Sequence, residues 1–132
     1  MGAFERLRSL FGRRAELPFD LDNPGLNVVA EAFDAAEADS AVLARSPGWR
    51  PAERAVLRHH LVLPASSIDR ARELLAQDGW ELRVVEPGEP SRVQALRVQV
   101  ITALSCAQER SRMAGLAQRL GGDALGWDCL QT

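Results

Sequence analysis

The feature that most constrains the fold is an ordered series of strand and helix patterns between Arg58 and Leu130. Alternating apolar residues predict strands, and apolar residues three or four positions apart predict helices. The predicted elements are a strand at 58–63, a helix at 68–78, a strand at 80–84, a long strand at 93–104, a helix at 106–120 and a last strand at 124–130. This β-α-β-β-α-β order is typical of the ferredoxin-like sandwich. We therefore expect an α+β domain with an antiparallel sheet and both helices on one face.

Turn and capping residues separate these elements. Pro64 follows the first predicted strand, and Ser66 or Ser67 is a candidate N-cap for the first predicted helix. Asp78-Gly79 and Gly121-Gly122 follow the two predicted helices, where glycine commonly ends a helix. The boundaries therefore agree with the apolar periodicity.

The histidines His59 and His60 are adjacent on the first predicted strand. Adjacent side chains on a strand point to opposite faces of the sheet, so the pair is poorly placed to hold one metal ion or relay one proton. A histidine general base would also need a nucleophile and an orienting carboxylate, and no motif supplies them. We expect structural or interface roles for both. Asp128, beside Trp127, is expected to be a solvated acid near the end of its strand.

The remaining chemical motifs do not favour catalysis. Cys106 and Cys129 are the only cysteines and lack histidines at metal-ligand spacing, so we expect buried thiols and no metal site. The chain has no P-loop, no G-x-G-x-x-G, no G-x-S-x-G and no H-E-x-x-H motif. We therefore expect a protein that is not an enzyme, with no catalytic residue and no cofactor.

The first 48 residues are predicted to form an N-terminal helical extension and linker, and residues 49–132 the ferredoxin-like domain. Within the extension, an amphipathic helix is predicted at 3–14 and a second helix at 28–38, where Asn27 is a candidate cap. Ser46-Pro47-Gly48 then interrupts the chain, and the Trp that follows is expected to anchor the linker on the domain.

Charge is distributed unevenly along the chain. Residues 1–14 hold four Arg and one Glu (+3), residues 15–44 hold seven acids and no base (−7), and the remainder holds twelve Arg against ten acids (+2). A nucleic-acid-binding domain would be more uniformly basic. RNA-recognition motifs of this architecture also present stacking aromatics on the sheet, and the strand at 93–104 has none. We therefore expect no direct contact with nucleic acid.

The chain has no apolar run of eighteen residues and no apparent secretory signal, so we expect a cytoplasmic protein without a membrane span. The helix at 3–14 carries four apolar residues among arginines. Three interpretations of this helix are open: a packed or frayed terminus, a docking helix for a protein partner, or a helix in peripheral contact with an anionic membrane.

Several of these residues resemble the regulator of ribonuclease activity B family. The resemblance rests on His59-His60-Leu61 entering a strand, on Asp78-Gly79-Trp80-Glu81-Leu82 after a helix, and on the closing Gly126-Trp127. It covers residues 58–130. Leu125 stands where the family has Asp, and Asp128 where it has Gly. The resemblance implies a ferredoxin-like fold and a non-enzymatic role in binding ribonuclease E and restraining RNA turnover.

The leading hypothesis is a regulatory or adaptor protein that acts by protein–protein contact on a partner of the ribonuclease E type. A small-ligand sensor on the same fold is the alternative, and a metal-assisted enzyme using His59 or His60 is the third hypothesis. The identity of the partner and the oligomeric state stay open. The residues expected at the partner interface are His59, His60, Trp127, Asp128, Phe4, Leu7, Phe11 and Arg8.

Overall fold

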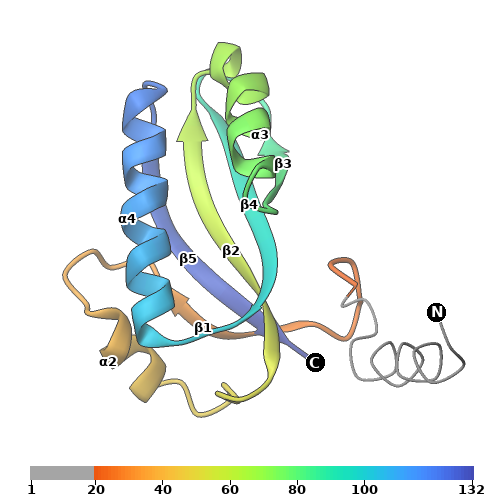
Figure 1. Ribbon diagram of the computed structural model, residues 1–132, viewed down its shortest axis with the longest axis vertical. Coiled ribbons are helices and arrows are strands. Elements are labelled where there is room, and N and C mark those ends of the chain that lie inside the picture. The colour runs from red at the N-terminus through yellow and green to blue at the C-terminus, as the bar shows by residue number, and fades with distance from the viewer. Residues whose placement is uncertain (1–19) are drawn as a thin grey trace, which may run out of the picture.

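The computed structural model describes residues 20–132 (Figure 1), so the predicted helix at 3–14, with Phe4, Leu7, Arg8 and Phe11, lies outside the described residues. The elements are β1 (Asn27–Ala32), α2 (Asp39–Ala44), β2 (Arg54–Leu63), the 3-10 turn η1 (Ala65–Ser67), α3 (Ile68–Ala76), β3 (Glu81–Glu86), β4 (Ser91–Val100), α4 (Ala103–Arg119) and β5 (Asp123–Gln131). The protein is therefore of the predicted α+β class.

The strands form one sheet in the order β1-β5-β2-β4-β3, and every neighbouring pair is antiparallel. The central strand β2 pairs with β4 along its whole length and with β5 on its other side. Figure 1 shows α4 running along β5 and α3 beside β3, with α2 at one end of the molecule.

The hydrophobic core lies between the sheet and the helices. Leu57 and Leu61 of β2 are fully buried in one cluster with Leu75 of α3 and Met113 of α4. Because alternate residues of a strand share a face, His59 points toward the helices and His60 toward the other face, here called the outer face. The prediction that the two histidines face opposite ways is confirmed.

The predicted helix at 28–38 is wrong, because this segment begins with strand β1. Apolar residues at 28, 29, 32, 33 and 36 fit a helical stripe, but Val28 and Val29 are β-branched and favour extended backbone. Pairing with β5 satisfies the backbone of this segment. The boundary expected at residue 49 falls between α2 and β2, and β1 on its N-terminal side is an edge strand of the same sheet.

The long predicted strand at 93–104 ends earlier than expected. β4 stops at Val100, and α4 begins at Ala103 rather than at 106. Thr102 and Ser105 form a capping box: each side chain accepts a hydrogen bond from the backbone N–H of the other residue, both at 3.0 Å. The apolar pattern runs through this junction without a break, so only the cap marks it.

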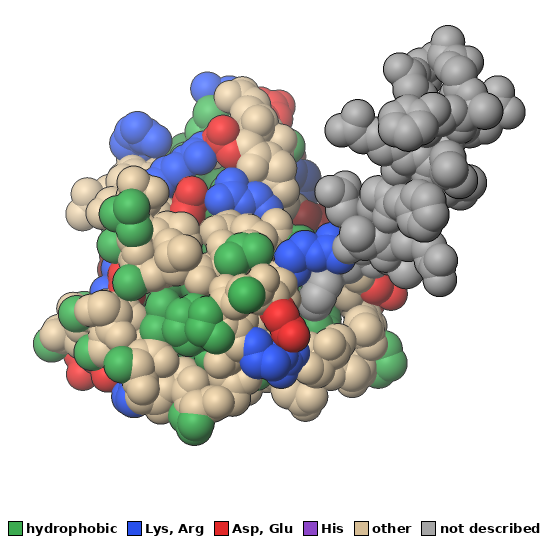
Figure 2. All heavy atoms as spheres, turned by 60° about the horizontal axis from the view of Figure 1, so that its bottom comes forward, with side chains coloured by type: hydrophobic (Ala, Val, Ile, Leu, Met, Phe, Trp, Pro, Cys, Tyr) green, Lys and Arg blue, Asp and Glu red, His purple; other side chains and the backbone are tan. Residues whose placement is uncertain are grey.

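Within residues 20–132, no helix is both long enough and apolar enough to cross a lipid bilayer. Exposed apolar side chains are dispersed over the strands, the loops and α4. In the face shown in Figure 2, hydrophobic side chains form small separate groups among basic and acidic ones.

Candidate functional site

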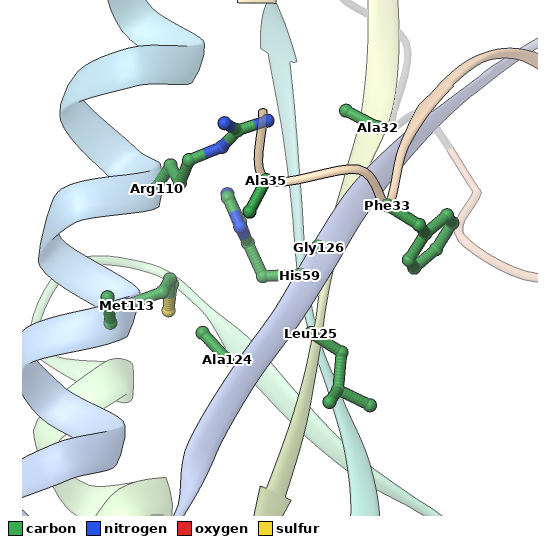
Figure 3. Close-up of a pocket in the computed structure, with 10 residues that line it drawn as sticks. Ala32, Phe33, Ala35, His59, Arg110, Met113, Ala124, Leu125 and Gly126 are labelled. Carbon is green, nitrogen blue, oxygen red and sulfur yellow. The ribbon is translucent and has the colours of Figure 1, made fainter. Parts of the chain in front are cut away.

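A cavity of about 200 Å³ opens between the segment joining β1 to α2, one side of α4, and β5 (Figure 3). Its walls come from these three stretches and from His59 of β2, which are far apart in the sequence. Most of the lining side chains are apolar, and only His59 and Arg110 bring nitrogen atoms into it. The lining residues are Ala32, Phe33, Ala35, His59, Arg110, Met113, Ala114, Ala124, Leu125 and Gly126.

Gly126 allows the segment after β1 to pass close over β5. Its φ is +150°, a conformation that residues with a side chain rarely adopt. A Cβ built there would lie 2.7 Å from Cδ1 of Phe33 and would also collide with the carbonyl oxygen of Ala32. The absence of a side chain at this one position therefore brings Ala32 and Phe33 into the cavity wall.

His59 is the buried polar residue of the cavity. Its side chain is 2% exposed, and its ring meets Trp80 edge to face with 5.3 Å between ring centroids. The buried Nε2 atom has no hydrogen-bond partner among the described residues. Burial, reinforced by the positive charges of His60, Arg110 and Arg97, lowers the pKa of His59 from 6.5 to about 3. At neutral pH the ring is therefore uncharged, and its Nε2 makes no hydrogen bond to another described residue.

Arg110 is fixed by a network that joins three elements. Its Nη2 lies 2.5 Å from Oδ1 of Asp39, at the first residue of α2. The same oxygen accepts a 3.0 Å hydrogen bond from Nε1 of Trp127 on β5. Asp39 is 7% exposed, and such a buried carboxylate is stable only when paired. The side chain of Arg110 therefore turns toward Asp39.

The outer face carries a second polar cluster. Arg58 binds the Asp128 carboxylate with both arms, at 2.8 Å from Nε and 2.5 Å from Nη2, and Nε2 of His60 lies 3.1 Å from Oδ1 of Asp128. Burial raises the pKa of Asp128, but the hydrogen bonds from Arg58 and His60 outweigh it, and the net shift is downward. The expectation of a solvated Asp128 is therefore wrong, since this side chain is an internal counter-ion.

The structure brings the four described candidate residues together in one sheet. His59 is the register partner of Trp127, and His60 that of Gly126. His59 and Trp127 face the helices, whereas His60 and Asp128 face outward. All four are buried, with exposures of 7% or less. Because these side chains are buried, a protein partner would contact the exposed residues around them rather than the side chains themselves.

Among the residues that line the cavity, His59 and Arg110 are the ones with polar side chains. None of the cavity-lining residues carries a hydroxyl, thiol, amine or carboxylate that could serve as a nucleophile. Cys106 and Cys129 are free and buried, and burial raises the pKa of each thiol to about 12, so both are protonated. Within residues 20–132, no three His, Cys, Asp or Glu side chains come together as a set of metal ligands.

Arg110, Phe33 and Ala35 are among the cavity residues that the sequence did not indicate. Phe33 and Ala35 fell in the wrongly predicted helix, and Arg110 looked like one of several surface arginines on α4. Arg58 was also missed, although it lies two residues before His60 and therefore on the same face of β2.

No family model matches this chain, and no curated protein or solved structure does.

Proposed function

We propose that this protein is a non-enzymatic regulatory domain that senses a small molecule bound in the cavity around His59. The observation that carries the proposal is His59, a residue of the cavity lining whose buried Nε2 has no hydrogen-bond partner among the described residues. A buried polar atom without a partner costs about 1–3 kcal/mol. A ligand that supplied the missing hydrogen bond would recover part of this free energy.

The fold proposed for this domain is a ferredoxin-like unit formed by β2, α3, β3, β4, α4 and β5. The antiparallel order β5-β2-β4-β3 within the sheet supports this assignment. In this scheme β1 is an additional edge strand on β5, and the segment after it closes one side of the cavity. The ligand site would therefore belong to the added segment as much as to the core unit.

The proposed regulation is a change in how firmly the β1–α2 segment is held. Phe33 and Ala35 lie on this segment, whereas Met113 and Leu125 lie on α4 and β5. A molecule that contacts both sides adds contacts between them. Binding would therefore stabilise the docked position of the segment and alter the surface that it presents.

The test is a melting screen of the full chain against small organic molecules, repeated with Ala114→Leu, which fills the cavity. A ligand at a hundredfold excess over its Kd should add about 2.7 kcal/mol to the free energy of unfolding. Ala107→Leu, the same change at an exposed position of α4, is the matched control. The proposal fails if no compound gives a shift that Ala114→Leu abolishes and Ala107→Leu retains.

A second candidate function is the binding of a protein partner of the ribonuclease E type, as the family resemblance implies. The pairing of His59 with Trp127 and of His60 with Gly126 supports it, since the two most distinctive motifs of the resemblance meet in the sheet. Phe33 and Leu125, 48% and 40% exposed, are apolar residues beside these motifs, since Phe33 packs on His60 and Leu125 precedes Gly126. The two candidates are compatible if the ligand controls the exposure of Phe33.

Affinity capture from the native cell with mass spectrometry tests this second candidate. The double variant Phe33→Ala, Leu125→Ala should lose the partner, whereas Leu104→Ala, at a 67% exposed position of α4, should retain it. A chain lacking residues 1–14 tests the N-terminal helix as a docking or membrane-contact element. Capture that is equal for all variants would rule out both surfaces.

A cytoplasmic location completes the proposal, and two free thiols suit a reducing compartment.

A further inference from the structure

We propose that the cavity takes a small organic monocarboxylate: one carboxylate group on an apolar body about the size of a single ring. This inference rests on the proposed function and names the chemical class of its ligand. Three properties of the site support it, namely the volume, the placement of the two polar side chains, and the apolar remainder of the wall.

The volume sets the size of the ligand. The cavity holds about 200 Å³. Sites for drug-sized molecules begin at about 300 Å³, whereas an apolar cavity of about 150 Å³ accommodates benzene. The present cavity therefore suits one ring, or a short branched chain, with one small polar substituent.

The two nitrogen-bearing side chains set the polar group. Figure 3 shows the ring of His59 extending toward the guanidinium of Arg110 on one side of the cavity. A guanidinium has five N–H donors, and the described contacts of Arg110 use it for one ion pair, with Asp39. A neutral imidazole donates from one nitrogen. A carboxylate can accept from both residues at once, which a single hydroxyl or amide oxygen does less strongly.

The polar partners of the site also suit an anion. Arg97 and Arg110 act on the ring of His59 as positive charges. Arg110 is paired with Asp39, and Asp39 also accepts the hydrogen bond from Trp127. The N–H groups of Arg110 that the ion pair leaves free would hydrogen-bond to a carboxylate placed beside His59, which offsets part of its desolvation.

The rest of the wall sets the apolar body. Met113 offers flexible apolar surface, and the remaining wall consists of alanines and Gly126. Phe33 and Leu125 lie at the mouth, where the ring of Phe33 packs edge to face on His60. A methionine thioether packs favourably against a ring. These side chains give a second charged group nothing to pair with, so dicarboxylates and zwitterions are disfavoured.

The experiment compares two pairs of matched probes on the full chain by titration calorimetry: benzoate with benzamide, and hexanoate with hexanamide. The members of each pair have nearly the same size and differ in charge. We expect at least one carboxylate to bind about tenfold more tightly than its amide, because hydrogen bonds to a charged group are the stronger ones. Ala114→Leu should abolish this binding and Ala107→Leu should retain it. Ala35→Leu in the exposed loop is a second blocking variant if Ala114→Leu does not fold.

The double variant Arg110→Gln, Asp39→Asn tests the origin of the preference. It removes both charges of the ion pair and keeps polar groups that can still hydrogen-bond to each other and to Trp127. We expect the affinity for the carboxylate to fall about tenfold, to the level of the amide, while the affinity for the amide changes little. A preference that survives in this variant would overturn the role assigned to Arg110.

The outcomes separate this inference from the function on which it rests. If the amides bind as tightly as the carboxylates, or if only compounds of another class give a shift that the cavity-filling variants abolish, the carboxylate assignment is overturned and the sensor function stands. If no compound of any class gives such a shift, the sensor function falls as well.

Discussion

Replacing Gly126 with alanine is expected to destabilise the protein strongly. The new Cβ would lie 2.7 Å from Cδ1 of Phe33 and 3.0 Å from its Cα, and would also meet the carbonyl oxygen of Ala32. Most of these atoms are backbone or rigid ring, so the β1–α2 segment would have to move. The backbone strain of a non-glycine residue at φ +150° costs about 1–3 kcal/mol, and overpacking costs about 1–3 kcal/mol more. We therefore expect a loss of roughly 2–6 kcal/mol in the free energy of unfolding.

Gly115→Ala is the matched control for this prediction. Gly115 lies inside α4, and a Cβ there would meet nothing within 4 Å. The same substitution should therefore stabilise the protein by about 0.5–1 kcal/mol, because alanine is the better helix former. Urea denaturation of the two variants and the wild type measures both changes. A Gly126→Ala protein within about 0.5 kcal/mol of the wild type, alongside a normally stabilised Gly115→Ala protein, would refute the close packing of the β1–α2 segment on β5.

Three further variants probe the buried polar groups and a helix cap. The pKa of His59 is depressed to about 3, so its contribution to stability is complete above pH 6.5 and is lost as the pH falls toward 3; His59→Phe should flatten this part of a stability–pH curve measured by urea denaturation. Asp128→Asn leaves Arg58 without its counter-ion and should cost about 3–5 kcal/mol, and an unchanged urea midpoint would contradict the paired geometry. Thr102→Ala removes the capping contact to Ser105 and should lower the free energy of unfolding by about 1 kcal/mol, whereas a loss below about 0.3 kcal/mol would show that the cap is not needed.

The strand and helix order from β2 to β5 was predictable because local periodicity and long-range packing agree there. Along β2, period two placed Leu61 with His59 and set His60 on the other face, and the structure confirms each of these assignments. That the opening histidine motif and the closing Gly126-Trp127 motif lie in one sheet is confirmed by their direct pairing.

The segment of β1 could not be read correctly from its own residues. Its apolar positions satisfy a helical stripe nearly as well as an alternating one, and Asn27 looks like a helix cap. The decision comes from the open edge of β5, whose backbone groups pair with Val28 and Glu31. The residues near β1 in the sequence do not indicate that β5 has an unpaired edge.

The cavity could not be predicted because no single segment contains it. Its polar residues come from β2 and α4, and one of its walls comes from the segment after β1. Arg110 has the same local pattern as Arg112 on the same helix. Arg110 differs because it pairs with Asp39 of α2. Asp39 follows β1 in the chain, and β1 is held on the sheet by its pairing with β5.

The pairing of β1 with β5 also closes a long loop of the chain. Asn27 lies opposite Gln131, so residues far apart in the sequence meet in the sheet. Asp39 also joins distant parts of the sequence, because it contacts Arg110 of α4 and Trp127 of β5. Such long-range closure is slow to form because its entropy cost precedes its contacts. The cavity wall formed by the β1–α2 segment therefore depends on contacts between distant parts of the sequence, and a disturbance at the β5 edge would loosen it.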